Sequence, residues 1–119
     1  MSTTNDLARF GLAHMDKRLV SPGELSLLWT EQKTVAGVGT GYGIGWRIVV
    51  DDEGHKWIGH GGGSIGGTTQ LWLFPESGLV IAMASNLTEL DYVDVLPRLR
   101  KLFVEHSPDR AEGHGKKAD

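Results

Sequence analysis

A glycine-rich stretch, residues 57–68 (WIGHGGGSIGGT), constrains the fold of this chain more than any other segment. It lies between two segments rich in β-branched and aromatic residues, and it brings glycines, an imidazole and hydroxyls together. Because glycine has no Cβ, the backbone here can come close to a packed strand or to a ligand. We therefore expect this stretch to border two strands and to form the edge of a site.

Composition excludes several classes of protein. With 119 residues the chain is one domain at most, and its net charge of −3 without a basic stripe argues against a nucleic-acid partner. The absence of cysteine excludes disulfides, zinc–thiolate sites and thiol nucleophiles. No apolar run reaches about 18 residues, so no membrane span is predicted. The N-terminus lacks a signal pattern, so the sequence indicates no compartment.

Helix signals stand at both ends of the chain. Residues 3–5 offer capping side chains before apolar residues at helical spacing, although Gly11 weakens that helix. Residues 21–24 (SPGE) combine a Ser cap, Pro at the first helical position and Glu three residues after the cap, which predicts a second helix. A last helix is expected to begin near Asp94, because Pro97 is tolerated only in a first turn.

Between these helices the pattern predicts two β-hairpins. The expected strands are, in chain order, 46–50, 55–59, 69–74 and 79–84. Residues 79–84 (LVIAMA) are apolar on both faces, which predicts a central strand of a covered sheet. The fold class is therefore α+β, an antiparallel sheet of about four strands with helices packed on it and a helix covering one face. We expect a domain over 1–107 and a disordered tail over 108–119.

Nucleotide and metal motifs are weak in this chain. Residues 61–66 formally match G-x-G-x-x-G, but a β-rich run follows where a dinucleotide site needs a helix. The histidines lack H-E-x-x-H spacing, so no metal site and no cofactor are expected. His55 lies beside a hairpin turn and is expected to be exposed. His60 is surrounded by glycines and accessible, although a histidine packed at a strand end is the alternative.

Taken in order, several segments resemble the C-terminal part of the serine beta-lactamase-related family, which includes class C beta-lactamases, DD-peptidases, family VIII esterases and the mitochondrial beta-lactamase-like protein. The similar segments are 2–10 (STTNDLARF), 21–22 with 28–30 (SP and LWT), 42–46 (YGIGW), 60–63 (HGGG), 74–78 (FPESG) and 84–86 (ASN). The segment HGGG resembles the family's H-x-G-G, the counterpart of the K-T-G motif of the lactamases. The likeness covers about residues 2–105 and implies part of a beta-lactamase/transpeptidase-like fold.

The resemblance also implies which catalytic residues this chain contains and which it lacks. The family uses a Ser nucleophile in S-x-x-K and a Tyr in Y-x-N, and this sequence contains neither pattern. We therefore expect a C-terminal fragment that is inactive alone and that needs the missing N-terminal part of the domain or a second copy as partner. By resemblance, His60, Gly62 and Gly63 form the catalytic third motif, with the Gly63 N–H as an oxyanion donor.

The implied substrate is a small ester, peptide or beta-lactam. Tyr42, Ser64 and Thr68 are candidate substrate-binding residues, but the two hydroxyls could equally satisfy a turn or a sheet edge. His60 would stand where lactamases carry Lys, and a partly charged imidazole anchors a carboxylate less well, which favours esters or peptides. Two alternatives stay open: an inactive module that binds peptide or cell-wall fragments, and a truncated structural remnant.

Overall fold

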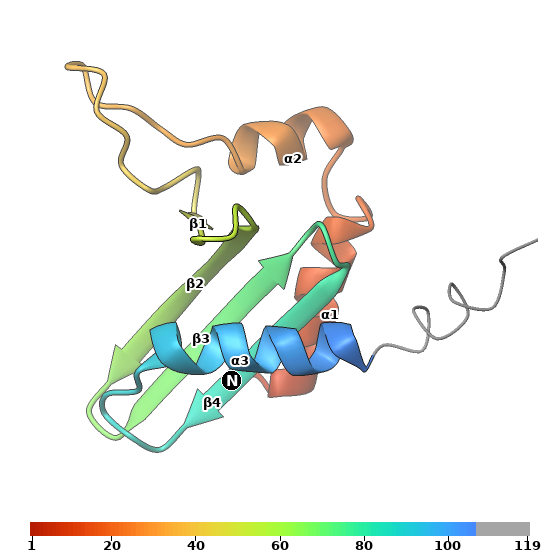
Figure 1. The fold of residues 1–119 in the computed structure, drawn as a ribbon, viewed down its shortest axis with the longest axis vertical. Helices are drawn as coiled ribbons and strands as arrows, with labels where there is room; N and C mark the ends of the chain where they lie inside the picture. Colours follow the sequence, from red (N-terminus) through yellow and green to blue (C-terminus); the bar gives the residue numbers. More distant parts are fainter. Residues whose placement is uncertain (107–119) are drawn as a thin grey trace, which may run out of the picture.

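The computed structural model describes residues 1–106 and contains three helices and one four-stranded sheet (Figure 1). The elements are α1 (Thr4–Met15), α2 (Pro22–Leu28), β1 (Arg47–Val50), β2 (Lys56–Ser64), β3 (Gly67–Phe74), β4 (Leu79–Ser85) and α3 (Tyr92–Glu105). This α+β architecture confirms the predicted fold class. The predicted tail over 108–119 lies outside the described residues.

The sheet is antiparallel throughout, in the order β1-β2-β3-β4. The prediction that residues 79–84 form a central strand is wrong for the described chain, because β4 pairs with β3 alone and stands at the edge. Its apolar pattern has another cause, which is that helices contact both of its faces. The apolar pattern of residues 79–84 indicates that both faces of the strand are buried. It does not determine whether the strand lies at the centre or at the edge of the sheet.

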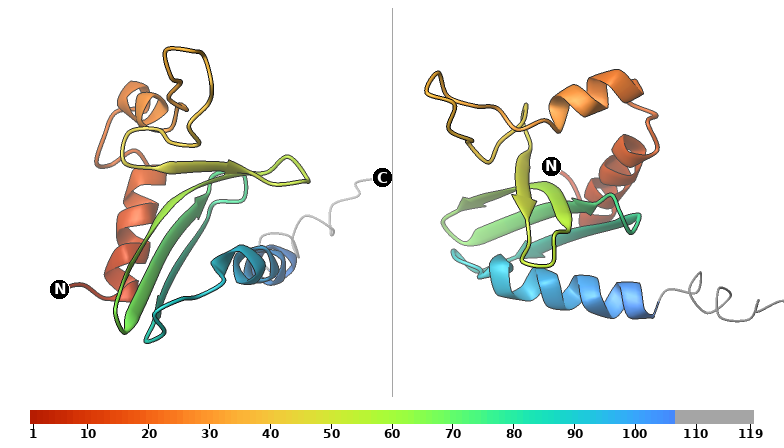
Figure 2. Two further views of the ribbon diagram at one scale, coloured as in Figure 1. Left: turned by 90° about the vertical axis from the view of Figure 1, so that its left-hand side faces the viewer. Right: turned by 45° about the horizontal axis from the view of Figure 1, so that its top comes forward.

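Helices cover both faces of the sheet, whereas the sequence predicted cover on one face. Figure 2 shows α1 and α3 on opposite sides of the strands. The α3 side buries a cluster of Trp57, Trp72, Phe74, Ile81 and Leu96, and the α1 side buries Trp46, Ile58, Leu71 and Leu73. Gly11, predicted to weaken α1, is buried, and a Cβ there would lie 2.8 Å from a methyl carbon of Val80. This glycine therefore lets α1 approach the sheet.

The helix starts follow their capping residues. Thr3 caps α1, and Ser21 with Glu24 forms the predicted capping box of α2. α3 begins at Tyr92, two residues before the predicted start, because Asp91 accepts a hydrogen bond from the Asp94 N–H. Pro97 consequently lies inside the helix, in its second turn. No helix in residues 1–106 is long and apolar enough to cross a membrane.

The glycine-rich stretch is mostly strand. β2 continues through it to Ser64, and only Ile65 and Gly66 connect β2 to β3. Gly66 has φ +86°, the conformation that the second residue of a type II turn requires. The tip of this hairpin lies beside the β4–α3 connection, where the Gly66 N–H donates to the Thr88 hydroxyl (Figure 1). The site predicted from the sequence therefore lies on a strand held at its end by a loop.

Candidate active site

A cleft of about 330 Å³ lies beside the first residue of β1, where β2 continues beyond β1 and is paired with β3 alone. Its lining includes Tyr42, Arg47, His60, the glycines 61–63, Gln70 and Tyr92. These residues come from the loop before β1, from β1, β2 and β3, and from the start of α3. The structure thus brings the predicted residues Tyr42, His60, Gly62 and Gly63 into one cleft, and Thr68 also lines it.

The outer edge of β2 is free along the cleft. β1 pairs with β2 only over Lys56–Gly59, whereas β3 pairs with β2 as far as Ser64. Because a two-residue turn makes Ser64 and Gly67 a hydrogen-bonded pair, antiparallel alternation makes Gly63 and Thr68 a non-hydrogen-bonded pair. The N–H of Gly63 therefore points away from β3, toward the edge that β1 leaves open.

The glycines of β2 fall into two groups. A Cβ on Gly59 would overlap the Leu71 carbonyl and the Trp72 ring, and one on Gly61 would overlap the buried side chain of Gln70. At Gly62 a Cβ would meet nothing within 4 Å, and at Gly63 its nearest neighbour would be 3.7 Å away. Packing against β3 therefore explains the first two glycines, whereas Gly62 faces open space and a Cβ on Gly63 would be in ordinary van der Waals contact.

His60 lies on the exposed part of β2, next to the ring of Tyr42. The two ring centroids are 5.9 Å apart, in an edge-on arrangement with an interplanar angle of 60°. The imidazole is therefore accessible, as predicted, and contacts an aromatic ring at the cleft. Such an imidazole can accept or donate a proton at a bound substrate.

The two predicted hydroxyls differ in their surroundings. Thr68 is buried, and its hydroxyl oxygen lies 2.8 Å from the Leu87 carbonyl and 3.0 Å from that of Thr88, so its proton is shared with the β4–α3 loop. Ser64 is exposed at the end of β2 and is not among the residues that line the cleft. The Thr68 hydroxyl thus fixes the loop that forms the far wall of the cleft.

Among the lining residues that sequence reasoning missed are Arg47, Gln70 and Tyr92. The Arg47 guanidinium donates to the Tyr92 hydroxyl at 2.8 Å, and its Cζ lies 5.6 Å from the centroid of the Tyr42 ring. Gln70 is buried and accepts a hydrogen bond from the Trp72 indole at 2.9 Å. Arg47 was missed because its pairing with Tyr42 depends on how residues 42–47 turn back, and the sequence does not reveal that turn.

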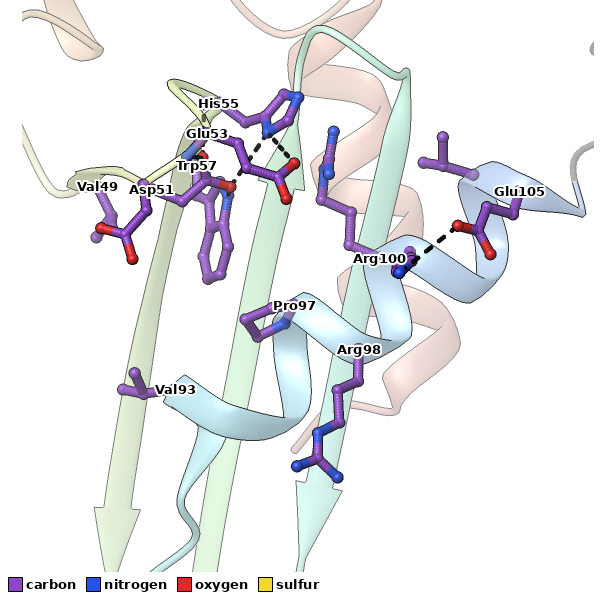
Figure 3. A pocket seen from close by; sticks show the side chains of 13 residues that line it. Val49, Asp51, Glu53, His55, Trp57, Val93, Pro97, Arg98, Arg100 and Glu105 are labelled. Carbon is purple, nitrogen blue, oxygen red and sulfur yellow. Dashed lines mark hydrogen bonds and ion pairs between the residues drawn. The ribbon is translucent and has the colours of Figure 1, made fainter.

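A larger cavity, of about 670 Å³, lies between the β1–β2 turn and α3 (Figure 3). Its walls are largely apolar, and most of its charged groups pair with one another. Arg98 pairs with Asp94 at 3.2 Å, Lys101 with Glu105 at 4.0 Å, and His55 with Asp51 and Glu53. Volume alone does not make an active site, so we assign the site to the smaller cleft, where the glycine edge lies.

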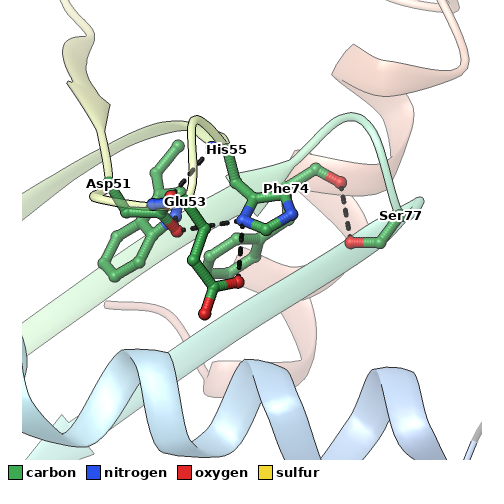
Figure 4. Close-up of polar contacts among 6 residues, drawn as sticks. Asp51, Glu53, His55, Phe74 and Ser77 are labelled. Carbon is green, nitrogen blue, oxygen red and sulfur yellow. Dashed lines mark hydrogen bonds and ion pairs between the residues drawn. The ribbon is translucent and has the colours of Figure 1, made fainter.

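Asp51 and His55 form the best-connected polar pair of that larger cavity (Figure 4). One Asp51 oxygen accepts from the backbone N–H groups of Glu53 and His55, and the other accepts from the Trp57 indole at 3.1 Å and lies 3.3 Å from His55 Nδ1. Burial alone would raise the pKa of Asp51, but these hydrogen bonds and the nearby imidazole together lower it.

This pair fixes the hairpin turn. The prediction that His55 is exposed is wrong, because its side chain is only 29% exposed and bonds to Asp51. In the part of the chain that the structure describes, no hydroxyl hydrogen-bonds to the imidazole of His55, so the pair lacks the nucleophile of a catalytic triad. Residues 1–106 also contain no group of three His, Cys, Asp or Glu side chains that could hold a metal ion.

Comparisons with known proteins bear on the family and the fold of the chain. The structure is similar to that of a D-stereospecific amidohydrolase from Streptomyces sp., with a TM-score of 0.61 and 27% sequence identity, over 73% of this chain and 26% of that chain. The chain therefore spans about a quarter of the amidohydrolase that it matches. No curated protein matches the chain. A family model described as Beta-lactamase matches residues 1–105, so the chain belongs to the beta-lactamase family.

Proposed function

We propose that this chain is the third-motif portion of a serine hydrolase that transfers acyl groups from esters or amides. In this proposal the substrate lies along the free edge of β2, and the Gly63 N–H donates to the oxyanion of the tetrahedral intermediate. His60 faces the same substrate and exchanges a proton with it or with the catalytic Tyr–Lys pair. The serine nucleophile comes from S-x-x-K in polypeptide that the 119 residues do not include.

The observation that carries the proposal is the open edge of β2 beside two unobstructed glycines. β1 begins at Arg47, which pairs with Gly59, and the outward N–H groups of β2 beyond Gly59 have no strand partner in the described chain. A planar acyl group can approach the Gly63 N–H there, because neither Gly62 nor Gly63 carries a Cβ that would crowd it. No atom within 4 Å requires a glycine at position 62, and a Cβ at position 63 would meet no atom closer than 3.7 Å.

The substrate class follows from the family and from the residue at position 60. The matched protein acts as an amidohydrolase, which favours an amide or ester over other acyl donors for this chain as well. His60 replaces the permanently charged lysine of the lactamase motif. Efficient beta-lactam hydrolysis is therefore less favoured than hydrolysis of a peptide or an ester.

The first test of the proposal is to sequence the DNA on the 5′ side of the reading frame that contains this chain. We expect the DNA that precedes the Met1 codon to encode S-x-x-K followed by Y-x-N. The product of the extended frame should hydrolyse p-nitrophenyl esters or D-amino acid amides and take a covalent label from a fluorescent fluorophosphonate. The 119-residue chain alone should take no label.

The role of Gly63 is tested in the extended product. Gly63→Pro removes the proposed oxyanion donor and should lower kcat by about 10²–10³-fold. Ile65→Pro is the matched control, because it adds the same ring at the exposed first position of the adjacent turn. Equal activity in the two variants would remove Gly63 from the mechanism. A stop codon just before Met1 would instead leave a ligand-binding module or a structural remnant.

A further inference from the structure

His14 is a buried imidazole that the proposed chemistry does not use. It lies in the last turn of α1 with only 7% of its surface exposed, and its Nδ1 is buried without a hydrogen-bond partner. Two aromatic rings contact it at nearly right angles, with the centroid of Phe10 at 4.7 Å and that of Trp46 at 5.1 Å. The imidazole therefore joins α1 to Trp46, the residue that immediately precedes β1.

Trp46 connects this contact to the cleft. Its carbonyl accepts a hydrogen bond from the Gly43 N–H at 2.8 Å, which closes a turn over residues 42–47. Tyr42 and Arg47 pair across the base of this 42–47 turn, and both line the cleft. The Trp46 side chain is itself buried. The contact between the indole and His14 therefore helps to fix one wall of the cleft.

No charged group of the described chain pairs with His14. β3 and β4, the strands that α1 contacts, contain no titratable side chain. The titratable residues of the other segments around the ring lie on α1 and just after it (Asp6, Arg9, Asp16, Lys17 and Arg18), on α2 and the loop that follows it (Glu24, Glu31, Lys33 and Tyr42), and on β1 and β2 (Arg47, Lys56 and His60). Within residues 1–106 none of them forms a hydrogen bond or an ion pair with the imidazole. The two aromatic rings carry no formal charge, so no carboxylate would compensate a positive charge on His14.

Protonation of His14 is therefore unfavourable while the ring stays buried. An imidazolium has a proton on both nitrogens, so Nδ1 would become a buried donor without an acceptor. The last turn of a helix favours a cation, whereas burial lowers the pKa of His14 from its ordinary value of 6.5. Below pH 6.5 a released ring consequently binds the proton more readily than the buried ring does, so release becomes more favourable as the pH falls.

We propose that the contact between His14 and Trp46 is a pH-sensitive latch on the cleft. A neutral imidazole keeps α1 and the 42–47 turn together. A protonated imidazole leaves the aromatic contact and frees the turn, so acid loosens this wall of the cleft. The close approach of Gly11 to Val80 holds the middle of α1 on the sheet, which confines the release to the last turn of the helix and the 42–47 turn. The latch belongs to the fold and operates whether or not the cleft performs acyl transfer.

The experiment is an NMR titration of the full ¹³C,¹⁵N-labelled 119-residue chain from about pH 8 to about pH 5. The ring signals of His14 give its protonation. The hydrogen-exchange protection factors of the Gly43 and Ile48 amides report on the turn, because Gly43 donates to the Trp46 carbonyl and Ile48 to the Gly41 carbonyl. Below pH 6.5 these two protection factors should fall by up to about tenfold per pH unit, while those of the β3 amides that pair with β2 stay constant.

Two variants identify the group responsible for the pH dependence. His14→Phe keeps an aromatic ring that cannot be protonated, so the protection of Gly43 should no longer depend on pH. His60→Gln is the matched control, because His60 also titrates and its ring lies 5.9 Å from that of Tyr42 in the same turn. The pH dependence should persist in His60→Gln.

Three results would overturn the latch. The first is a pKa of His14 at or above 6.5 with the protection of the turn unchanged. The second is an equal loss of protection in β3, which would mean that acid unfolds the whole chain. The third is a pH dependence that survives His14→Phe and disappears in His60→Gln. If the amide dispersion at neutral pH shows that His14→Phe is not folded, the first two criteria decide on the unmodified chain alone. None of these results affects acyl transfer by the extended product, so the latch can fail while the proposed function stands.

Discussion

At the scale of single residues, the glycines of β2 show that one residue type can serve two purposes in one strand. Trp72 and Gln70 of the neighbouring strand fill the space that a Cβ would need at Gly59 and Gly61. A side chain at either glycine would therefore displace part of the core. A Cβ on Gly62 would meet nothing within 4 Å, and one on Gly63 would meet no atom closer than 3.7 Å. Sequence alone grouped them as one accessible stretch, because the letters do not reveal where along the strand neighbouring side chains pack against the backbone.

The different surroundings of Gly59 and Gly62 predict that replacing each with Ala has different effects on stability. Gly59→Ala forces its Cβ into the Trp72 ring and the Leu71 carbonyl and should destabilise the fold by about 1–3 kcal/mol. Gly62→Ala meets no atom, and the lower entropy of its unfolded chain should leave stability unchanged or raised by up to about 1 kcal/mol. Urea unfolding followed by tryptophan fluorescence measures both. Similar losses in both variants would contradict this difference in their surroundings.

At the scale of elements, the β1–β2 hairpin depends on one carboxylate. Asp51 accepts hydrogen bonds from two backbone N–H groups of its own turn and from the buried Trp57 indole, so it joins the turn to the core on the α3 side. The sequence predicted the turn from its acidic and glycine residues. It did not reveal this network, because the bond from Trp57 forms only once the two strands pair in register.

Loss of this carboxylate should therefore weaken the whole fold. Asp51→Ala leaves the Trp57 indole N–H without its acceptor and should cost about 1–3 kcal/mol, whereas Asp52→Ala in the same exposed turn should cost little. Thermal unfolding at neutral pH measures the difference. An equal effect of the two substitutions would show that the turn, and not the carboxylate network, sets the stability.

The same carboxylate predicts a pH dependence. The pKa of Asp51 is lowered from its ordinary value of 3.8, so the unfolded chain binds its proton more readily than the folded chain does. Its stabilising contribution is complete above pH 3.8 and decreases as the pH falls through the lower folded pKa. The stability difference between the unmodified chain and Asp51→Ala should therefore narrow below that pH in urea titrations. A constant difference would contradict the lowered pKa.

At the scale of the whole molecule, the sequence predicted the elements better than their arrangement. The capping residues Thr3 and Ser21 and the turn at 75–78 act locally, so their signals predicted where helices and hairpins lie. The order of strands and the cleft depend on contacts between distant segments, such as Arg47 with Tyr92, which have no local signal. β4 is the clearest case, because it has the composition of a central strand and the position of an edge strand.

The composition of β4 leads to a prediction about association. Its seven residues include no charged side chain, proline or glycine, and one row of its backbone groups has no strand partner in the described chain. Natural edge strands usually carry such residues to prevent pairing, so two copies of β4 should pair at high concentration. Sedimentation velocity should show concentration-dependent association of the 119-residue chain.

A charge on this edge should oppose that association. Ala84→Lys places an exposed cation on β4 and should weaken self-association about fivefold, because a symmetric pair brings two such cations close together. Ser77→Lys adds the same charge in the exposed β3–β4 turn and serves as the control, with little effect expected. If both lysines weaken association equally, net charge is responsible. If only Ala84→Lys does, the free backbone of β4 is the surface that a second strand occupies.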